Sequence, residues 1–242
     1  LCKFGDNVVD GVYISETEVS CVSPSFVDRN GDYETGVVIL SVALNGQDFS
    51  KNLVKFVYVS HLEIVQLFPQ SVSSEGGVHI TVKGRNFMDS ENLKCRFDDT
   101  HVVSATWVSR NEMVCGAMPS FVQSGHRVSL EVSNNGVEYT QSTELYVLKR
   151  WWISSVEPSK GPASGNNVVI NIHGENFVPD VEDSWMCRFG DSNLIRAFWI
   201  SSSTLRCVLP PHRPGVVSVK VTPNAMEFSN SAGDTEHFEY YA

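Results

Sequence analysis

The chain has 242 residues, enough for one large domain or for two to three small ones. Hydrophobic residues make up 42% and charged residues 19%, a balance typical of globular proteins that excludes wholesale disorder. The formal net charge of −10 argues against a nucleic-acid-binding module, which needs a positive surface to neutralise phosphates.

Neither a membrane span nor a targeting segment is predicted. No apolar run approaches the about 18 residues that a membrane-spanning helix requires, and no basic-then-apolar signal stands at the N-terminus. The chain begins at Leu1 rather than Met. We therefore expect a mature or excised segment of a longer protein, without membrane contact of its own.

The first predicted elements lie within residues 1–59, named module one here, and all are short strands. Cys2 opens the segment CKFGD, the strand GVYIS follows at 11–15, and Cys21 stands in VSCVSP. A hairpin is predicted over 37–50, VVILSVALNGQDFS, because its Asn-Gly dipeptide supplies the positive φ angles that tight hairpin turns need.

Residues 60–149, module two, repeat these elements after an additional pair of strands. The segment GGVHITVKGRNF at 76–87 alternates apolar and polar residues, the pattern of a strand with one buried face. Cys95 then opens CRFDD, and Cys115 stands in MVCGAMP. A second Asn-Gly hairpin, VSLEVSNNGVEYTQS, is predicted over 128–142.

Residues 150–242, module three, follow the same outline. The alternating segment GNNVVINIHGENF occupies 165–177, Cys187 opens CRFGD, Cys207 stands in LRCVLPP, and a last hairpin covers 216–231. The three cysteine couples are 19, 20 and 20 residues apart and recur every 93 and 92 residues. Internal repetition of this kind defines a tandem architecture.

The repeated segments predict an all-β fold of tandem β-sandwich modules with little or no helix. His61–Lys94 and Ile153–Met186 carry the first strands of modules two and three, whereas only Leu1 precedes Cys2. We therefore expect module one to be incomplete at its N-terminus and residues 1–59 not to fold independently. Either the natural chain continues before Leu1, or another chain donates the missing strands.

These segments resemble the IPT/TIG domain family. The similarity rests on Cys-Arg-Phe-Gly, a strand ending in Trp-Ile/Val-Ser, Cys-x-x-Pro, the Asn-Gly hairpin and the opening Gly-Gly-x-x-Ile-x-Val-x-Gly-x-Asn-Phe, and it covers nearly the whole chain. The resemblance implies tandem immunoglobulin-like modules of the plexin and transcription-factor type. The paired cysteines match the extracellular branch of the family, which implies a location outside the cell or on its surface.

Two cysteines per module at constant spacing, in a chain without other cysteines, predict one disulfide per module. Zinc is the alternative, but structural zinc sites use four ligands that include tight Cys-x-x-Cys couples, and the sequence has no such couple. Disulfides persist in oxidising compartments, which agrees with an extracellular location. The predicted pairs are Cys2–Cys21, Cys95–Cys115 and Cys187–Cys207.

An acidic loop in module one is a weak calcium candidate. Asp28, Asn30 and Asp32 alternate in FVDRNGDYETG like the first ligands of an oxygen-rich calcium loop. That loop needs glycine at its sixth position, where Tyr33 stands, so a solvated loop is the favoured interpretation. We expect no other metal and no cofactor.

Trp151 and Trp152 have no counterparts in module two, where Leu62 and Glu63 stand. Neighbouring residues of a strand face opposite ways, so one of the two indoles should leave its own core. We predict that Trp151 or Trp152 packs at the interface between modules two and three and limits their bending. An exposed anchor for a partner protein is the alternative.

The sequence contains no motif for nucleophilic, phosphate-binding or dinucleotide chemistry. We therefore predict that the chain is not an enzyme and has proteins as partners, without nucleic acid or a small-molecule substrate. The first hypothesis is an extracellular structural spacer in a cell-surface receptor, adhesin or filament. The alternative is a ligand-recognition ectodomain of a plexin-like or growth-factor-receptor-like protein. An accessory module of a carbohydrate-active enzyme is a lesser alternative.

Overall fold

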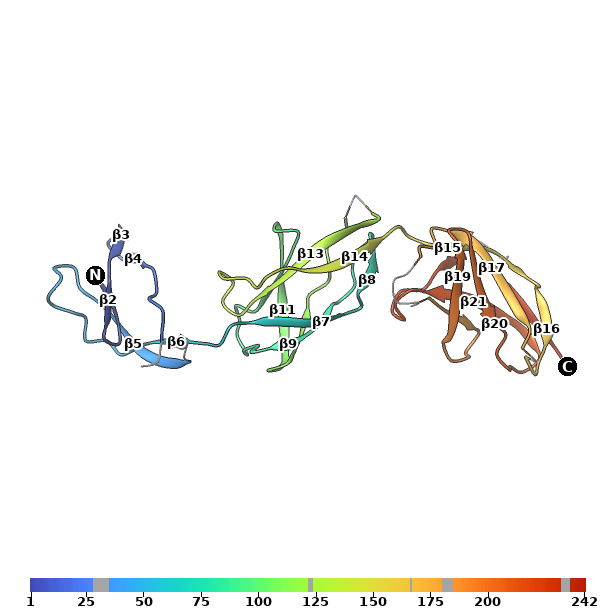
Figure 1. The fold of residues 1–242 in the computed structure, drawn as a ribbon, viewed down its shortest axis with the longest axis horizontal. Helices are drawn as coiled ribbons and strands as arrows, with labels where there is room; N and C mark the ends of the chain where they lie inside the picture. The colour runs from blue at the N-terminus through green and yellow to red at the C-terminus, as the bar shows by residue number, and fades with distance from the viewer. Residues whose placement is uncertain (28–34, 122–123, 166, 180–184, 232–235) are drawn as a thin grey trace. The chain divides into compact units, whose positions relative to one another are not determined.

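The described part of the chain is built from β-strands and contains no helix (Figure 1). It divides into two compact units, Leu1–Leu62 and Glu63–Ala242. The computed structural model describes all residues except 28–34, 122–123, 166, 180–184 and 232–235. The predicted all-β fold of tandem sandwich modules is confirmed.

The first unit contains a four-stranded antiparallel sheet and a separate hairpin. The strand order in the sheet is β2-β1-β5-β6, and β3 pairs with β4 in the hairpin. Within the described part of this unit, the buried hydrophobic residues are Cys2, Phe4 and Ala43, so the core is small. The strands are β1 Cys2–Phe4, β2 Asn7–Val9, β3 Gly11–Ser15, β4 Glu18–Cys21, β5 Gly36–Val42 and β6 Val54–Tyr58.

Module two is a sandwich whose two layers share one strand, in the order β7-β9-β12-β11-β10-β13-β14-β8. The first part of β11 pairs with β10 and the second part pairs with β12, so this strand passes from one layer to the other. The strands are β7 Glu63–Phe68, β8 Ser71–Ser73, β9 Thr81–Arg85, β10 Lys94–Phe97, β11 His101–Ser109, β12 Glu112–Cys115, β13 His126–Ser133 and β14 Thr143–Leu148.

Module three repeats this plan, with β19 as the shared strand and the order β16-β23-β21-β18-β19-β20-β17-β15-β22. The strands are β15 Trp152–Glu157, β16 Lys160–Pro162, β17 Val169–Glu175, β18 Met186–Phe189, β19 Ile195–Ser201, β20 Thr204–Val208, β21 Gly215–Thr222, β22 Asn230–Ser231 and β23 His237–Tyr241.

The alternating sequence pattern explains which face of each strand is buried. In β17, Ile170 and Ile172 are completely buried, while the intervening Asn171 is partly exposed. The two isoleucines stand opposite Cys207 and Leu205 of β20, which are also completely buried. Burying one such side chain stabilises a fold by about 1.5–3 kcal/mol, so a few alternating positions are sufficient to hold a strand against the core.

Module one lacks neighbours that its counterparts possess. In module two β12 continues the sheet to β9, and in module three β20 continues it to β17. In the described part of the first unit, the equivalent strand β4 pairs with β3 and with no other strand. Tyr13 of β3 is 64% exposed, whereas the equivalent Trp199 of module three is 37% exposed.

Candidate functional site

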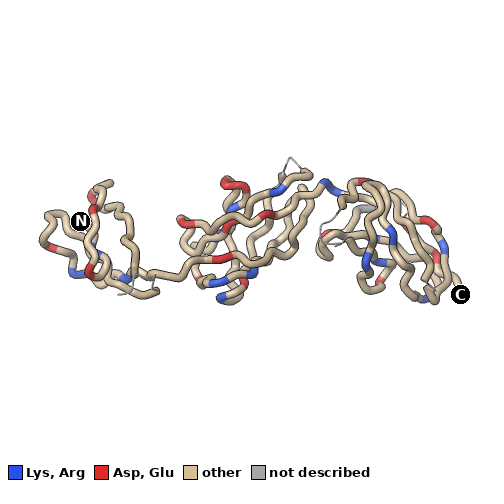
Figure 2. The backbone as a smooth tube through the Cα atoms, in the orientation of Figure 1, with Lys and Arg blue, Asp and Glu red and all other residues tan. Residues whose placement is uncertain are grey.

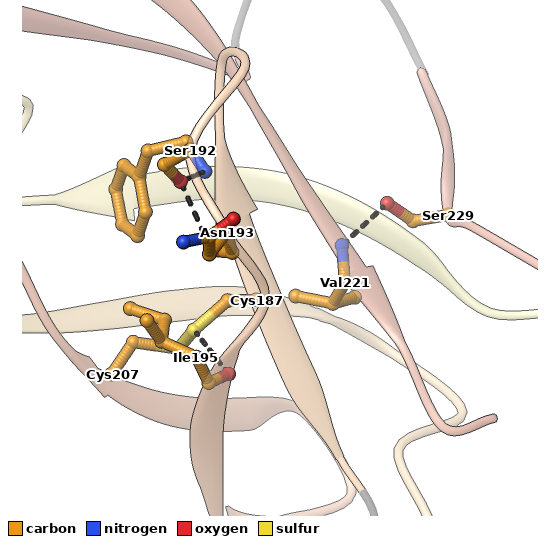
Figure 3. Close-up of a disulfide and its surroundings, with 8 residues drawn as sticks. Cys187, Ser192, Asn193, Ile195, Cys207, Val221 and Ser229 are labelled. Carbon is orange, nitrogen blue, oxygen red and sulfur yellow. Dashed lines mark hydrogen bonds between the residues drawn. A yellow bond between two sulfur atoms is a disulfide. The ribbon is translucent and has the colours of Figure 1, made fainter. Parts of the chain in front are cut away.

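The disulfides join the two layers of each sandwich. Cys95 lies on β10 and Cys115 on β12, in different layers, with Cα atoms 5.8 Å apart. Figure 3 shows the equivalent bond of module three, between Cys187 and Cys207. The third bond joins Cys2 to Cys21 in the first unit. Closing a loop of 20 residues contributes about 3 kcal/mol in the chain-entropy model, so these cysteines have a structural role.

A basic residue directly after the first cysteine of each module lies over the aromatic ring of the same module's hairpin. This cation–π contact ties a central strand to the hairpin. The contact was not predicted from the sequence, although the aromatic residue always stands four positions after the turn asparagine. The pairs are Lys3 over Phe49 at 5.7 Å, Arg96 over Tyr139 at 3.9 Å and Arg188 over Phe228 at 4.2 Å.

The structure places Trp151 in the core of module three. Its side chain is completely buried, its ring packs edge-on against Trp185 at 5.7 Å, and its Nε1 donates to the backbone oxygen of Val221. The same apolar cluster includes Leu148, the last residue of β14 in module two. Trp152 is partly exposed on β15. That these tryptophans limit bending between the modules stays a prediction.

The weak calcium candidate Asp28, Asn30 and Asp32 lies outside the described residues. Among the residues that the structure describes, no group of three or more His, Cys, Asp or Glu side chains could hold a metal ion. The calcium interpretation therefore stays a sequence-based hypothesis.

His212 of module three forms polar contacts through both of its ring nitrogens. Its Nε2 lies 2.8 Å from Oδ1 of Asp191, and its Nδ1 lies 2.9 Å from the backbone oxygen of Arg213. Both acceptors are satisfied when the imidazole carries two protons. The hydrogen bonds to Arg213 and Asp191 therefore raise the pKa of His212, and the bond from His212 lowers the pKa of Asp191.

The ring of His212 also stacks on Tyr240, with centroids 4.9 Å apart. The hydroxyl of Tyr240 donates to the backbone oxygen of Pro210 at 3.0 Å, and burial raises the pKa of Tyr240 to about 12. The tyrosine therefore stays neutral at physiological pH. These contacts hold the loop after β20 in place. They also pack the titratable imidazole of His212 against Tyr240, a core residue of module three.

Within the second unit, a groove of about 920 Å³ is lined by residues of modules two and three. Phe68 and Tyr146 line it from module two, and Trp185 and Ala225 line it from module three. Phe68 is 49% exposed there. Trp185 was not among the residues predicted from the sequence, although a tryptophan two residues before the first cysteine occurs in this module alone.

The hairpin turns of the three modules share one local structure, an asparagine followed three residues later by an acidic residue. The asparagine Oδ1 accepts hydrogen bonds from two backbone N–H groups ahead of it, an Asx turn. In module two these donors are Val137 and Glu138, both 2.9 Å away. The three segments are Asn45–Asp48, Asn135–Glu138 and Asn224–Glu227.

Charged residues are interspersed throughout the described chain. Figure 2 shows Lys and Arg positions scattered among Asp and Glu positions in each unit. The expected absence of a nucleic-acid partner stays a prediction. Among the described residues, no helix has the length and apolar character to cross a membrane.

The family of the chain follows from its two complete modules. The IPT/TIG domain matches residues 62–146 and 152–240, which together make up most of the sequence. The chain therefore belongs to the IPT/TIG domain family, as the repeated sequence motifs predicted. Both matches contain the shared-strand sandwich described above.

Several related proteins are plexins. The chain is 33% identical to plexin A3 from Danio rerio over 118 residues, which cover 44% of this chain and 6% of that protein. It is 26% identical to plexin-A3 from Rattus norvegicus over 157 residues, which cover 62% of this chain and 8% of that protein. It thus spans less than a tenth of the curated relatives that it matches.

A solved structure of the full extracellular region of plexin A4 covers 99% of this chain and 26% of that chain, at 15% identity and a TM-score of 0.45. The three disulfides and the plexin relatives show that the chain is an extracellular or cell-surface segment.

Proposed function

We propose that the chain is part of the extracellular region of a plexin-like receptor and contributes to protein recognition without catalysing a reaction. The observation that carries this proposal is the 33% identity to plexin A3 over 118 residues, together with the IPT/TIG matches in both complete modules. These findings favour the ectodomain hypothesis of the sequence analysis over the generic spacer, and they support no role as an accessory module of an enzyme.

The surface of the second unit is suitable for contact with proteins. The groove combines aromatic side chains, such as Phe68 and Tyr146, with the ion pair between Arg127 and Glu144. Aromatic residues and arginine are enriched in protein interfaces relative to the rest of the protein surface. We propose protein partners on this basis.

We further propose that residues 1–59, 60–149 and 150–242 are three modules of one tandem array. The spacer hypothesis remains the second candidate, favoured by side-chain hydrogen bonds that join modules two and three. The two functions differ in one respect, because a recognition segment needs a partner on its own surface and a spacer does not.

The natural full-length protein provides the test. Its coding sequence should contain a membrane anchor and further extracellular modules, and an epitope-tagged version should be labelled by a membrane-impermeant biotin reagent on intact cells. A protein that resists surface labelling and keeps its cysteines reduced would contradict the proposal. Cross-linking on intact cells then separates the candidates, since recognition predicts cross-links from 63–242 to another protein.

A further inference from the structure

Strand β8 lies at the edge of its sheet in module two. It pairs with β14 in parallel through Ser71, Val72 and Ser73, and it is the last strand in the order of the sheet. An edge strand presents a row of backbone N–H and C=O groups that require partners. Ser73 is completely buried, so water is not the partner available to it.

The Asn224–Glu227 turn of module three supplies the partners. Nδ2 of Asn224 donates to the backbone oxygen of Ser71 at 2.8 Å, and the backbone N–H of Ser73 donates to Oε2 of Glu227 at 2.9 Å. Residues two apart in a strand direct their backbone groups to the same side. The two side chains therefore occupy the place that a neighbouring strand would take.

The turn is also ordered by hydrogen bonds within itself. Oδ1 of Asn224 accepts from the backbone N–H groups of Met226 and Glu227, and Nδ2 also donates to Oε2 of Glu227 at 2.9 Å. One asparagine thus orders the loop and orients the carboxylate toward β8. A contact made by pre-ordered groups loses little conformational entropy when it forms.

Arg150 compensates the charge of Glu227, whose side chain is 10% exposed. Its Nη1 lies 3.9 Å from Oε1 of Glu227, and its Nε lies 3.6 Å from Oε2 of Glu75 in module two. Its Nη2 donates to the backbone oxygen of Phe228, next to the turn. The arginine therefore links an acidic residue of each module.

The turn of module two is a natural comparison because the Oδ1 atom of its asparagine accepts hydrogen bonds from the two equivalent backbone N–H groups. Its Asn135 and Glu138 are exposed, whereas Asn224 is 7% exposed. Modules one and two use Gly46 and Gly136 after the asparagine, both at a φ of 74°. In module three this position is Ala225, with a φ of 62°, a conformation that is energetically unfavourable for a residue with a Cβ atom. Ala225 also lines the groove.

We propose that the Asn224–Glu227 turn is a docking surface whose partner is the free edge of β8, and that this docking holds modules two and three in one fixed arrangement. The inference goes beyond the proposed function, because it concerns the two modules themselves and holds for a receptor or a spacer. Since Ser71, Asn224 and Ala225 all line the groove, the docked turn also determines the shape of that surface.

The experiment compares matched variants of the whole chain. Asn224→Ala and Glu227→Ala remove the docking groups, and Asn135→Ala and Glu138→Ala remove the equivalent groups of the undocked turn. Residual dipolar couplings measure the alignment of modules two and three separately. We expect one common alignment tensor in the unmodified chain and in the control variants, and two different tensors in the Asn224→Ala/Glu227→Ala double variant.

Hydrogen exchange at the Ser73 amide provides a second measurement. Loss of its acceptor in Glu227→Ala should accelerate exchange by about tenfold, and Glu138→Ala should leave it unchanged. Dispersed amide spectra of both modules establish that each variant is folded. If Glu227→Ala does not fold, Glu227→Gln, which retains an oxygen acceptor, is measured in its place. Different tensors in the unmodified chain, or a common tensor and unchanged exchange in the folded docking variants, would overturn the proposal.

Discussion

The backbone N–H of Ser73 donates a hydrogen bond to the carboxylate of Glu227, although 154 residues separate the two along the chain. A backbone group at the edge of one sandwich is thus satisfied by a side chain of the next module. The hydrogen bond occupies a backbone group that another strand would otherwise need for pairing at this edge.

We predict that residues 61–242 fold by themselves and that residues 1–59 do not. The longer segment contains the two sandwiches with most of the buried hydrophobic residues of the described chain. In the described part of residues 1–59, no further strand lies beside the hairpin formed by β3 and β4. Cooperative unfolding and dispersed amide resonances are expected of 61–242 alone, and their observation in an isolated 1–59 peptide would contradict the prediction.

Replacing Asp191 by Asn should lower the pKa of His212. In the folded protein the hydrogen bonds of His212 raise its pKa above the ordinary value of 6.5. The protonated imidazole of His212 therefore stabilises the folded protein fully at pH values below that ordinary pKa. This stabilisation is lost as the pH rises through the pKa that His212 has in the folded protein. An NMR titration of the imidazole in the unmodified chain and in Asp191→Asn measures the change.

Asp99→Asn is the matched control for this titration, because Asp99 occupies the equivalent position after Cys95 and module two has Ser120 where module three has His212. The control should leave the pKa of His212 unchanged. Equal titration curves of His212 in the unmodified chain and in Asp191→Asn would show that Asp191 does not raise the pKa of His212.

Arg96→Met should destabilise module two by about 2 kcal/mol. The change removes the guanidinium from the ring of Tyr139 and leaves the carboxylate of Glu131 without its ion-pair partner in a largely buried position. Urea unfolding followed by tryptophan fluorescence gives the free energy. Arg85→Met is the control, because the pair of Arg85 with Glu63 is exposed and should be worth less than about 1 kcal/mol. Equal losses of unfolding free energy in the two variants would contradict the prediction that Arg96 stabilises module two more than Arg85 does.

Replacing Trp151 and Trp152 together by Ala should broaden the distribution of angles between modules two and three. Trp151 belongs to a buried cluster that also contains Leu148 of module two, so its removal leaves a cavity next to the junction. Small-angle scattering of a folded 61–242 segment measures the effect. Trp199→Ala serves as the control, since Trp199 lies on β19 and donates to Phe177 within module three. A scattering profile that stays unchanged in the double variant would exclude the prediction.

The sequence by itself determined the modular β-architecture. Recurrent cysteine couples and alternating segments such as 165–177 are local signals that repeat along the chain, and they predicted strands without reference to the surrounding structure. The Asn-Gly segments predicted the turns, but the second strands of the two hairpins begin later than expected, at Val54 and Thr143. The pairing of the cysteines followed for the same reason, because the two members of each couple stand 19 or 20 residues apart.

Only the tertiary structure decided which of the repeated elements form contacts between modules. Asn135–Glu138 and Asn224–Glu227 have the same local turn, yet the first presents exposed side chains and the second is docked on β8. The difference arises from a neighbouring strand far away in sequence, which no local pattern encodes. Trp185 was missed for the same physical reason, because its burial against Trp151 depends on strands that meet only in the folded module.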